Sequence, residues 1–173
     1  MNLLIHPAIA LLNVGYYDRA EAKGERASFY GTGNTAHAGE LIEALDAERP
    51  AVCEAYGVRY RTVLDHIRIL YGAEGADVQE AVAQSAFYRD VGDLPTDIWR
   101  IWMGTDLPLA HVPFVLLAEN AGCNATLHRG FVDIVAVLLD VTPWKDGLTL
   151  ERLGLAGMDA AVMTVYAETG LPS

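Results

Sequence analysis

Apolar residues recur three and four positions apart along nearly the whole chain, which is the spacing of a helix with one buried face. No segment longer than a few residues alternates apolar and polar side chains as a half-buried strand would. The sequence also contains no internal repeat. The pattern therefore predicts an all-α fold, and 173 residues fit a single helical domain over residues 1–173.

Glycine and proline divide this helical pattern into segments. Pro50 is expected to interrupt the stretch that Asn34 or Thr35 caps, while Gly57 and Gly72 are expected helix stops. We expect helices at 4–13, 41–56 with a break near Pro50, 60–71, 77–88, 112–121, 127–140, 151–155 and 160–168. Loops are expected at 18–34 and 140–149, with an irregular segment holding about one helical turn at 89–110.

Charge and cysteine content limit the partners and the compartment. The formal net charge of -11 argues against nucleic acid and anionic membranes, because both need a basic surface. Cys53 and Cys123 lie in separate segments without a C-x-x-C pattern and are predicted to be reduced thiols. No uninterrupted apolar run approaches the ~18 residues of a membrane span, and no basic leader precedes the first helix. We therefore expect a cytoplasmic protein.

Two polar residues lie inside the apolar segment at the amino terminus. Asn2 and His6 are four positions apart, so a helix places both side chains on one face, where they can meet one substrate. Unpaired polar groups are costly inside a core, which gives the pair a reason to be functional. The structural alternative is that His6 is a satisfied core histidine and Asn2 is a helix cap.

Residues 31–36 match the G-x-G-x-x-A pattern of dinucleotide-binding loops, but their context does not. That pattern requires a buried strand immediately before it, whereas the residues at 25–30 are mostly polar. We interpret the segment as a flexible loop that leads into a helix, and we predict no cofactor site in this chain. The remaining histidines lack the spacing of metal ligands, so no metal site is predicted either.

Several short blocks, in order along the chain, resemble the helical C-terminal domain of octopine/nopaline (opine) dehydrogenases. They are Asn2-x-x-x-His6-Pro7 with Leu11-Leu12-Asn13-x-Gly15, Ile42-Glu43-Ala44-Leu45-Asp46-Ala47-Glu48-Arg49, Thr105-Asp106-Leu107-Pro108 with Val112-Pro113, and Leu150-Glu151-Arg152-Leu153-Gly154-Leu155. The resemblance implies the helical fold of that domain, which is like the C-terminal domain of 6-phosphogluconate dehydrogenase.

The resemblance also implies a reaction and a set of site residues. Members condense an amino acid with a 2-keto acid and reduce the imine with NAD(P)H, which a Rossmann domain holds. The family's catalytic histidine corresponds to His6, its partner aspartate to Asp106 and its substrate-contacting asparagine to Asn2. Arg100 is the nearest counterpart of the arginine that meets the substrate carboxylate, although it lies one position further from Asp106 than expected.

Two further features of the sequence bear on this interpretation. Trp102 lies close to Asp106 in the sequence and is predicted to form an apolar wall over the substrate, with ordinary core packing as the alternative. The chain departs from the family pattern at Thr105 and Leu148, where the family carries Glu and Arg.

Met1 stands directly before the histidine block, so the Rossmann domain is expected to be absent. We expect the substrate-binding and proton-transfer half of an opine-dehydrogenase-like enzyme, which uses NAD(P) through a separate Rossmann chain and takes amino acid and keto acid substrates. The apolar excess favours a homo-oligomer. The alternatives are a cofactor-free enzyme that uses the His–Asp pair for imine, enol or cyclisation chemistry, and a non-catalytic dimerisation or binding module.

Overall fold

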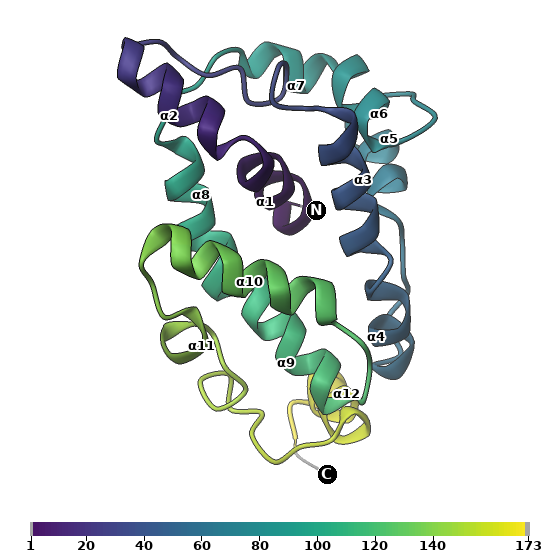
Figure 1. Ribbon diagram of the computed structural model, residues 1–173. Coiled ribbons are helices and arrows are strands. Elements are labelled where there is room, and N and C mark those ends of the chain that lie inside the picture. The colour runs from purple at the N-terminus through teal and green to yellow at the C-terminus, as the bar shows by residue number, and fades with distance from the viewer. Residues whose placement is uncertain (1, 172–173) are drawn as a thin grey trace. The chain divides into compact units, whose positions relative to one another are not determined.

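A computed structural model describes residues 2–171, with the side chain of Asn2 outside the described part. Within these residues the fold is all-α, as predicted, and the chain forms no strand beyond one isolated antiparallel bridge between Ala27 and Leu94 (Figure 1). The helices are α1 (Asn2–Leu12), α2 (Val14–Lys23), α3 (Ala36–Asp46), α4 (Arg49–Ala55), α5 (Val63–Tyr71), α6 (Val78–Gln84), α7 (Ala86–Val91), α8 (Ile98–Asp106), the π-helical η1 (Leu107–His111), α9 (Val112–Asn120), α10 (Thr126–Leu139), α11 (Pro143–Asp146) and α12 (Ala160–Thr169).

The described residues fall into two compact units, each built from two separate stretches of chain. The first unit comprises residues 2–46 and 61–104, and the second comprises residues 47–60 and 105–171. The number of independently folding domains, which we expected to be one, stays a prediction.

The first unit is organised around α1, which packs against α3. Helix α1 is apolar on nearly every side, and its buried residues Leu4, Ile5 and Ile9 are at most 1% exposed. A helix that is hydrophobic all round is stable only when it is surrounded by other elements. Helices α5 and α6 pack against α3 in the same unit and complete its core.

The second unit has its own core, formed where α4 meets α9. Val52 contributes from α4 and Val115 and Ala118 from α9, with Tyr56 and Phe114 packed around them. Helices α9, α10 and α11 contact η1, so the π-helical turn is a central element of this unit. Gly147 lies against it, because a Cβ there would fall 3.0 Å from the Pro108 carbonyl oxygen.

Most helix boundaries agree with the sequence patterns. The Thr35 hydroxyl accepts a hydrogen bond from the Ala38 N–H at the start of α3, and Pro50 lies in the first turn of α4. Gly57 and Gly72 adopt the left-handed backbone conformation that ends a helix, with φ values of 63° and 59°. The expected helix at 77–88 is divided at Ser85 into α6 and α7. Residues 151–154 form turns, so the helix expected at 151–155 is absent from this described segment.

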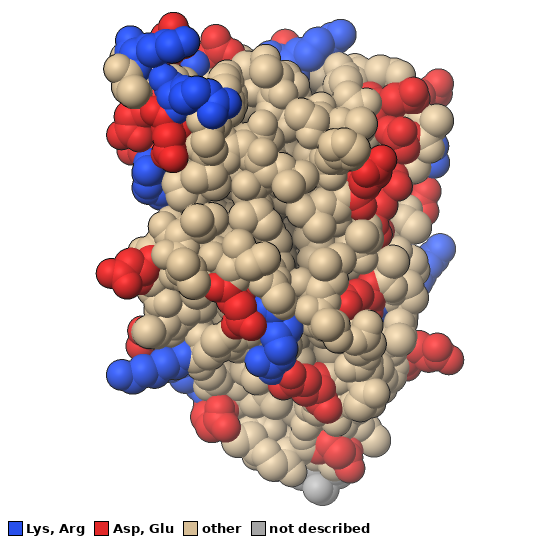
Figure 2. Space-filling view, in the orientation of Figure 1, with Lys and Arg blue, Asp and Glu red and all other residues tan. Residues whose placement is uncertain are grey.

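Three segments expected to be loop or irregular are at least partly helical, and the shortest of these helices is α11 within the loop expected at 140–149. Helix α2 covers part of the predicted loop at 18–34, because Tyr17 and Ala20 are buried on one face while the other positions tolerate charge. Charged side chains gather over α2 in Figure 2. Helix α8 and η1 cover much of 89–110, where Pro108 had suggested a break. The proline lies in the first turn of η1, and the interruption is accommodated as a local π-helical turn.

The helical residues from Ile98 to Asn120 are long and apolar enough to cross a membrane by length and composition, and about a third of their most apolar stretch is buried. The sequence pattern alone does not indicate this, because Arg100, Asp106 and Glu119 interrupt the apolar run. Core helices of soluble proteins pass the same criterion, so the helix by itself is weak evidence for a span. Cys53 and Cys123 are free thiols, as predicted, and the cytoplasmic location stays a prediction.

Candidate active site around His6

Helix α1 presents His6 at the edge of the first unit's core. The side chain is half-buried, and its neighbours Ile5 and Pro7 are buried. The imidazole stacks on the indole of Trp102, with ring centroids 4.1 Å apart and planes inclined by 13°. Parallel stacking at this distance fixes the plane of the imidazole, which orients both ring nitrogens.

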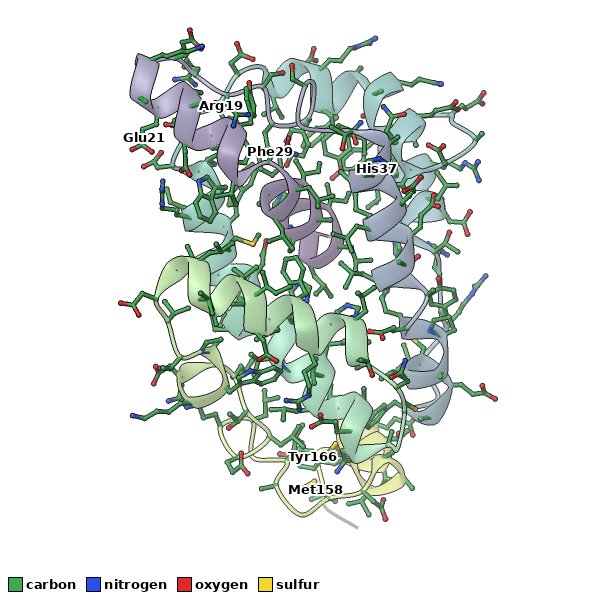
Figure 3. The ribbon with its side chains drawn as sticks, viewed as in Figure 1. Arg19, Glu21, Phe29, His37, Met158 and Tyr166 are labelled. Atoms are coloured by element: carbon green, nitrogen blue, oxygen red, sulfur yellow. The ribbon has the colours of Figure 1, made fainter. Side chains whose placement is uncertain are left out.

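Two further aromatic rings enclose this stack. Phe29 meets the His6 ring edge-on at 6.3 Å and the Trp102 ring at 4.8 Å, while the Tyr30 ring lies 6.2 Å from His6. Phe29 comes from the segment after α2 (Figure 3) and is fully buried. Together the three rings place the imidazole in a largely apolar surrounding with restricted rotation.

Two glycines hold the turn that supplies Phe29 and Tyr30. A Cβ on Gly31 would fall 2.3 Å from the Ser28 hydroxyl oxygen, and one on Gly33 would fall 2.4 Å from the Phe29 carbonyl oxygen. Backbone thus excludes a side chain at Gly33, whereas a side chain at Gly31 would require the Ser28 hydroxyl to move. The glycines that resembled a nucleotide loop therefore serve to close a tight aromatic-bearing turn beside His6.

Helix α8 carries Arg100, Trp102 and Asp106, and their side chains do not all leave the helix in the same direction. Trp102 and Asp106 are one helical turn apart, so their side chains leave the same face of the helix. Arg100 is two residues before Trp102 and projects differently. Its guanidinium lies 3.5 Å from the Asp18 carboxylate, 3.4 Å from the Glu21 carboxylate and 4.6 Å above the Trp99 ring. Figure 3 shows Glu21 on α2.

The structure thus brings only some of the predicted site residues together. His6 and Trp102 are brought together, and Arg100 is engaged by acidic residues of α2 in the same unit. Asp106 is half-buried in the second unit. Asn2 begins α1, so its backbone is one turn from His6 as expected, but its side chain lies outside the described residues. The roles of Asp106, Asn2 and Arg100 stay predictions.

Sequence reasoning missed Phe29 and Tyr30 as neighbours of His6. A local signal was present, since two aromatic residues precede the Gly31-x-Gly33 pair, but no periodicity connected them to α1.

Comparison with known proteins identifies the chain's relatives. The family model for the alpha-helical domain of NAD/NADP octopine/nopaline dehydrogenases matches residues 1–139. The chain belongs to this family. It is also 31% identical to the opine dehydrogenase of Arthrobacter sp. (strain 1C) over 161 residues, which are 93% of the chain and 44% of that enzyme. The chain therefore spans less than half the length of this curated relative.

In the octopine/nopaline dehydrogenase family, the helical domain is usually joined to an NAD-binding domain. The Gly31–Ala36 segment does not fit a dinucleotide-binding loop. Such a site needs a strand–turn–helix unit, whereas Gly31–Ala36 follows only the isolated bridge at Ala27. Ser28 and Phe29 also occupy the space beside Gly31 and Gly33, so these glycines leave no open space for a bound phosphate group.

Proposed function

We propose that this chain is the substrate-binding and proton-transfer part of an opine-dehydrogenase-like oxidoreductase, acting on an amino acid and a 2-keto acid. The NAD(P) would be held by a Rossmann domain carried on another polypeptide or on a further part of the same one. The observation that carries the proposal is the half-buried imidazole of His6, held flat against Trp102 in a chain of this family.

His6 would act as the base in forming the imine. The imidazole would take a proton from the amine nitrogen as that nitrogen attacks the keto carbon. It then passes that proton to the alkoxide oxygen, which gives the neutral carbinolamine, and afterwards moves the remaining proton of the nitrogen to the hydroxyl group, which leaves as water as the imine forms. The apolar rings around His6 would exclude bulk water and so favour loss of water from the intermediate.

Asp106 would assist by accepting a hydrogen bond from the imidazole, which fixes its tautomer and stabilises the imidazolium. Support for this role comes from the Thr105-Asp106-Leu107-Pro108 block that resembles the family, and from its position one turn after Trp102 in α8. Arg100 is the corresponding proposal for binding the substrate carboxylate.

The proposal is tested by joining the chain to the NAD-binding part of the Arthrobacter opine dehydrogenase and screening pairs of amino and keto acids for NAD(P)H oxidation. We expect turnover that His6→Ala reduces by at least 100-fold and Asp106→Asn by at least 10-fold. His37→Ala is the matched control, because His37 is exposed and pairs only locally with Glu40 at 2.9 Å.

A second measurement uses the chain alone. We expect amino or keto acids to shift the imidazole NMR signals of His6 and to leave those of His37 in place. Binding without turnover in the joined protein would overturn the catalytic role and favour a binding module. Substrate consumption without nicotinamide would overturn it in favour of a cofactor-free enzyme.

A further inference from the structure

The second unit contains a pocket of about 670 Å³ that the proposed chemistry at His6 does not use. Its walls come from α4, α9 and α12, and Figure 1 shows α12 beside α9. Small-molecule sites typically measure about 300–1,000 Å³, so the pocket has the size of such a site. Helix α12 lies beyond the residues 1–139 that match the family model.

The pocket presents mainly carbon to a ligand. Its apolar lining side chains come from all three helices and from the segments that flank them. They are Val52, Val58, Phe114, Leu117, Leu155, Met163 and Ala167. The Tyr56 hydroxyl donates to the Leu117 carbonyl oxygen at 3.0 Å. The Thr164 hydroxyl oxygen likewise lies 2.9 Å from the Ala160 carbonyl oxygen. The protons of these two hydroxyl groups are already donated to backbone carbonyls, so a ligand in this pocket would be held mainly by apolar contact.

The charges around the pocket favour a neutral ligand. Arg49 and Glu168 are its charged lining residues, and their opposite signs leave the lining without net charge. Burial raises the pKa of Tyr56, and the nearby Cys123 adds to the rise, so this phenol is also neutral. Although the chain has a net charge of -11, this lining offers no excess charge to attract an ion.

We propose that the pocket formed by α4, α9 and α12 binds an uncharged, largely apolar small molecule. Removing the apolar surfaces of both ligand and pocket from water would drive binding. The half-buried thiol of Cys53 lines the pocket and would be covered by the ligand. This binding does not depend on the reaction proposed at His6.

The test uses the neutral dye N-phenyl-1-naphthylamine, whose fluorescence rises in apolar sites. We expect saturable binding of one dye per chain. Ala167→Phe would fill the pocket from its exposed rim and weaken binding at least tenfold. Ala161→Phe is the matched control, because Ala161 is exposed on the same helix but does not line the pocket, and it should leave affinity unchanged. Circular dichroism confirms that both variants remain folded.

A second readout follows the cysteines by mass spectrometry during labelling with N-ethylmaleimide. Saturating dye should slow the labelling of Cys53 several-fold and leave the rate at Cys123, which does not line the pocket, unchanged. Equal dye affinity in the Ala167→Phe and Ala161→Phe variants, or an unprotected Cys53, would overturn the site. Tighter binding of the anionic dye 1-anilinonaphthalene-8-sulfonate than of the neutral dye would overturn the assignment to uncharged ligands.

Discussion

Individual side chains fix local structure in this protein through contacts far apart in sequence, and Glu48 is the clearest case. Its carboxylate accepts hydrogen bonds from the Leu127 N–H at 2.8 Å and from the His128 N–H at 3.0 Å. It also accepts one from the Nδ1–H of the fully buried His128 at 2.9 Å. Glu48 thus caps the start of α10 from a different stretch of the chain, a role that Ala125, the residue preceding α10, has no side-chain group to perform.

The pKa of Glu48 makes this cap sensitive to pH. Burial alone would raise the pKa, but the hydrogen bonds from Leu127 and His128 outweigh it and hold the pKa below its usual value near 4.5. A lowered folded-state pKa means that the carboxylate stabilises the fold fully above the unfolded pKa. That contribution is lost as the pH falls through the lower, folded value.

We therefore predict that Glu48→Gln lowers the free energy of unfolding by roughly 2–4 kcal/mol at pH 7, because charge-assisted hydrogen bonds and a helix cap are weakened. The difference from the unaltered chain should shrink as the pH falls from 5 toward 3. Urea unfolding across this range measures it. A difference that stays constant down to pH 3 would show that the carboxylate charge is not what stabilises α10.

The sequence predicted the residue at the centre of the candidate site but not its surroundings. His6 stood out because a polar side chain inside the apolar run of α1 needs a partner. Phe29 and Tyr30 could not be predicted to surround it, because only the folded turn closed by Gly31 and Gly33 brings them there. Glu48 and His128 were missed for the same reason, since their contact spans 80 positions.

At the level of elements, the sequence predicted helices well where one apolar face or a clear cap marked them. Helix α5, expected at 60–71, forms at Val63–Tyr71 and ends at Gly72, where the stop signal is local. Helix α2 was missed because its polar composition hides a narrow buried face of Tyr17 and Ala20. Helix α8 was missed because prolines were interpreted as breaks, whereas Pro108 is accommodated by the π-helical turn that follows.

Helix–helix contact decides the effect of substituting the helical glycines, and two of them offer a matched comparison. Gly39 lies in α3, where a Cβ would fall 2.8 Å from the Gln79 Cβ and 3.2 Å from its backbone nitrogen in α6. Gly130 occupies a similar early position in α10, but nothing lies within 4 Å of the Cβ it would gain. Alanine has the higher helix propensity at both positions, so only the surroundings differ.

We predict opposite signs for the two alanine variants. Gly130→Ala should raise the free energy of unfolding by about 0.5–1 kcal/mol through helix propensity alone. Gly39→Ala should lower it by roughly 1–3 kcal/mol, because α3 and α6 must move apart to admit the methyl group. Urea titrations followed by circular dichroism compare both variants with the parent chain. Stabilisation by Gly39→Ala would mean that the contact between α3 and α6 is looser than the structure indicates.

At the level of the whole molecule, net charge is the property that the sequence determines most directly. Twenty-three acidic residues against twelve basic ones give a formal charge of -11, and the isoelectric point is near 4.7. Exposed ion pairs such as Arg100 with Glu21 offset little of the repulsion between the excess acidic residues, because surface pairs contribute at most about 1 kcal/mol each. Folding therefore concentrates like charges that repel one another.

Salt should stabilise this protein at neutral pH, although it weakens individual ion pairs. Raising NaCl from about 10 to 200 mM shortens the screening length from about 30 Å to below 10 Å, which reduces repulsion across the molecule. We predict that the free energy of unfolding at pH 7 rises by on the order of 1 kcal/mol over this range. The rise should disappear near pH 4.7, where the net charge approaches zero. Thermal and urea unfolding at both pH values measure the effect, and a decrease with salt at pH 7 would show that attractive pairs outweigh the net repulsion.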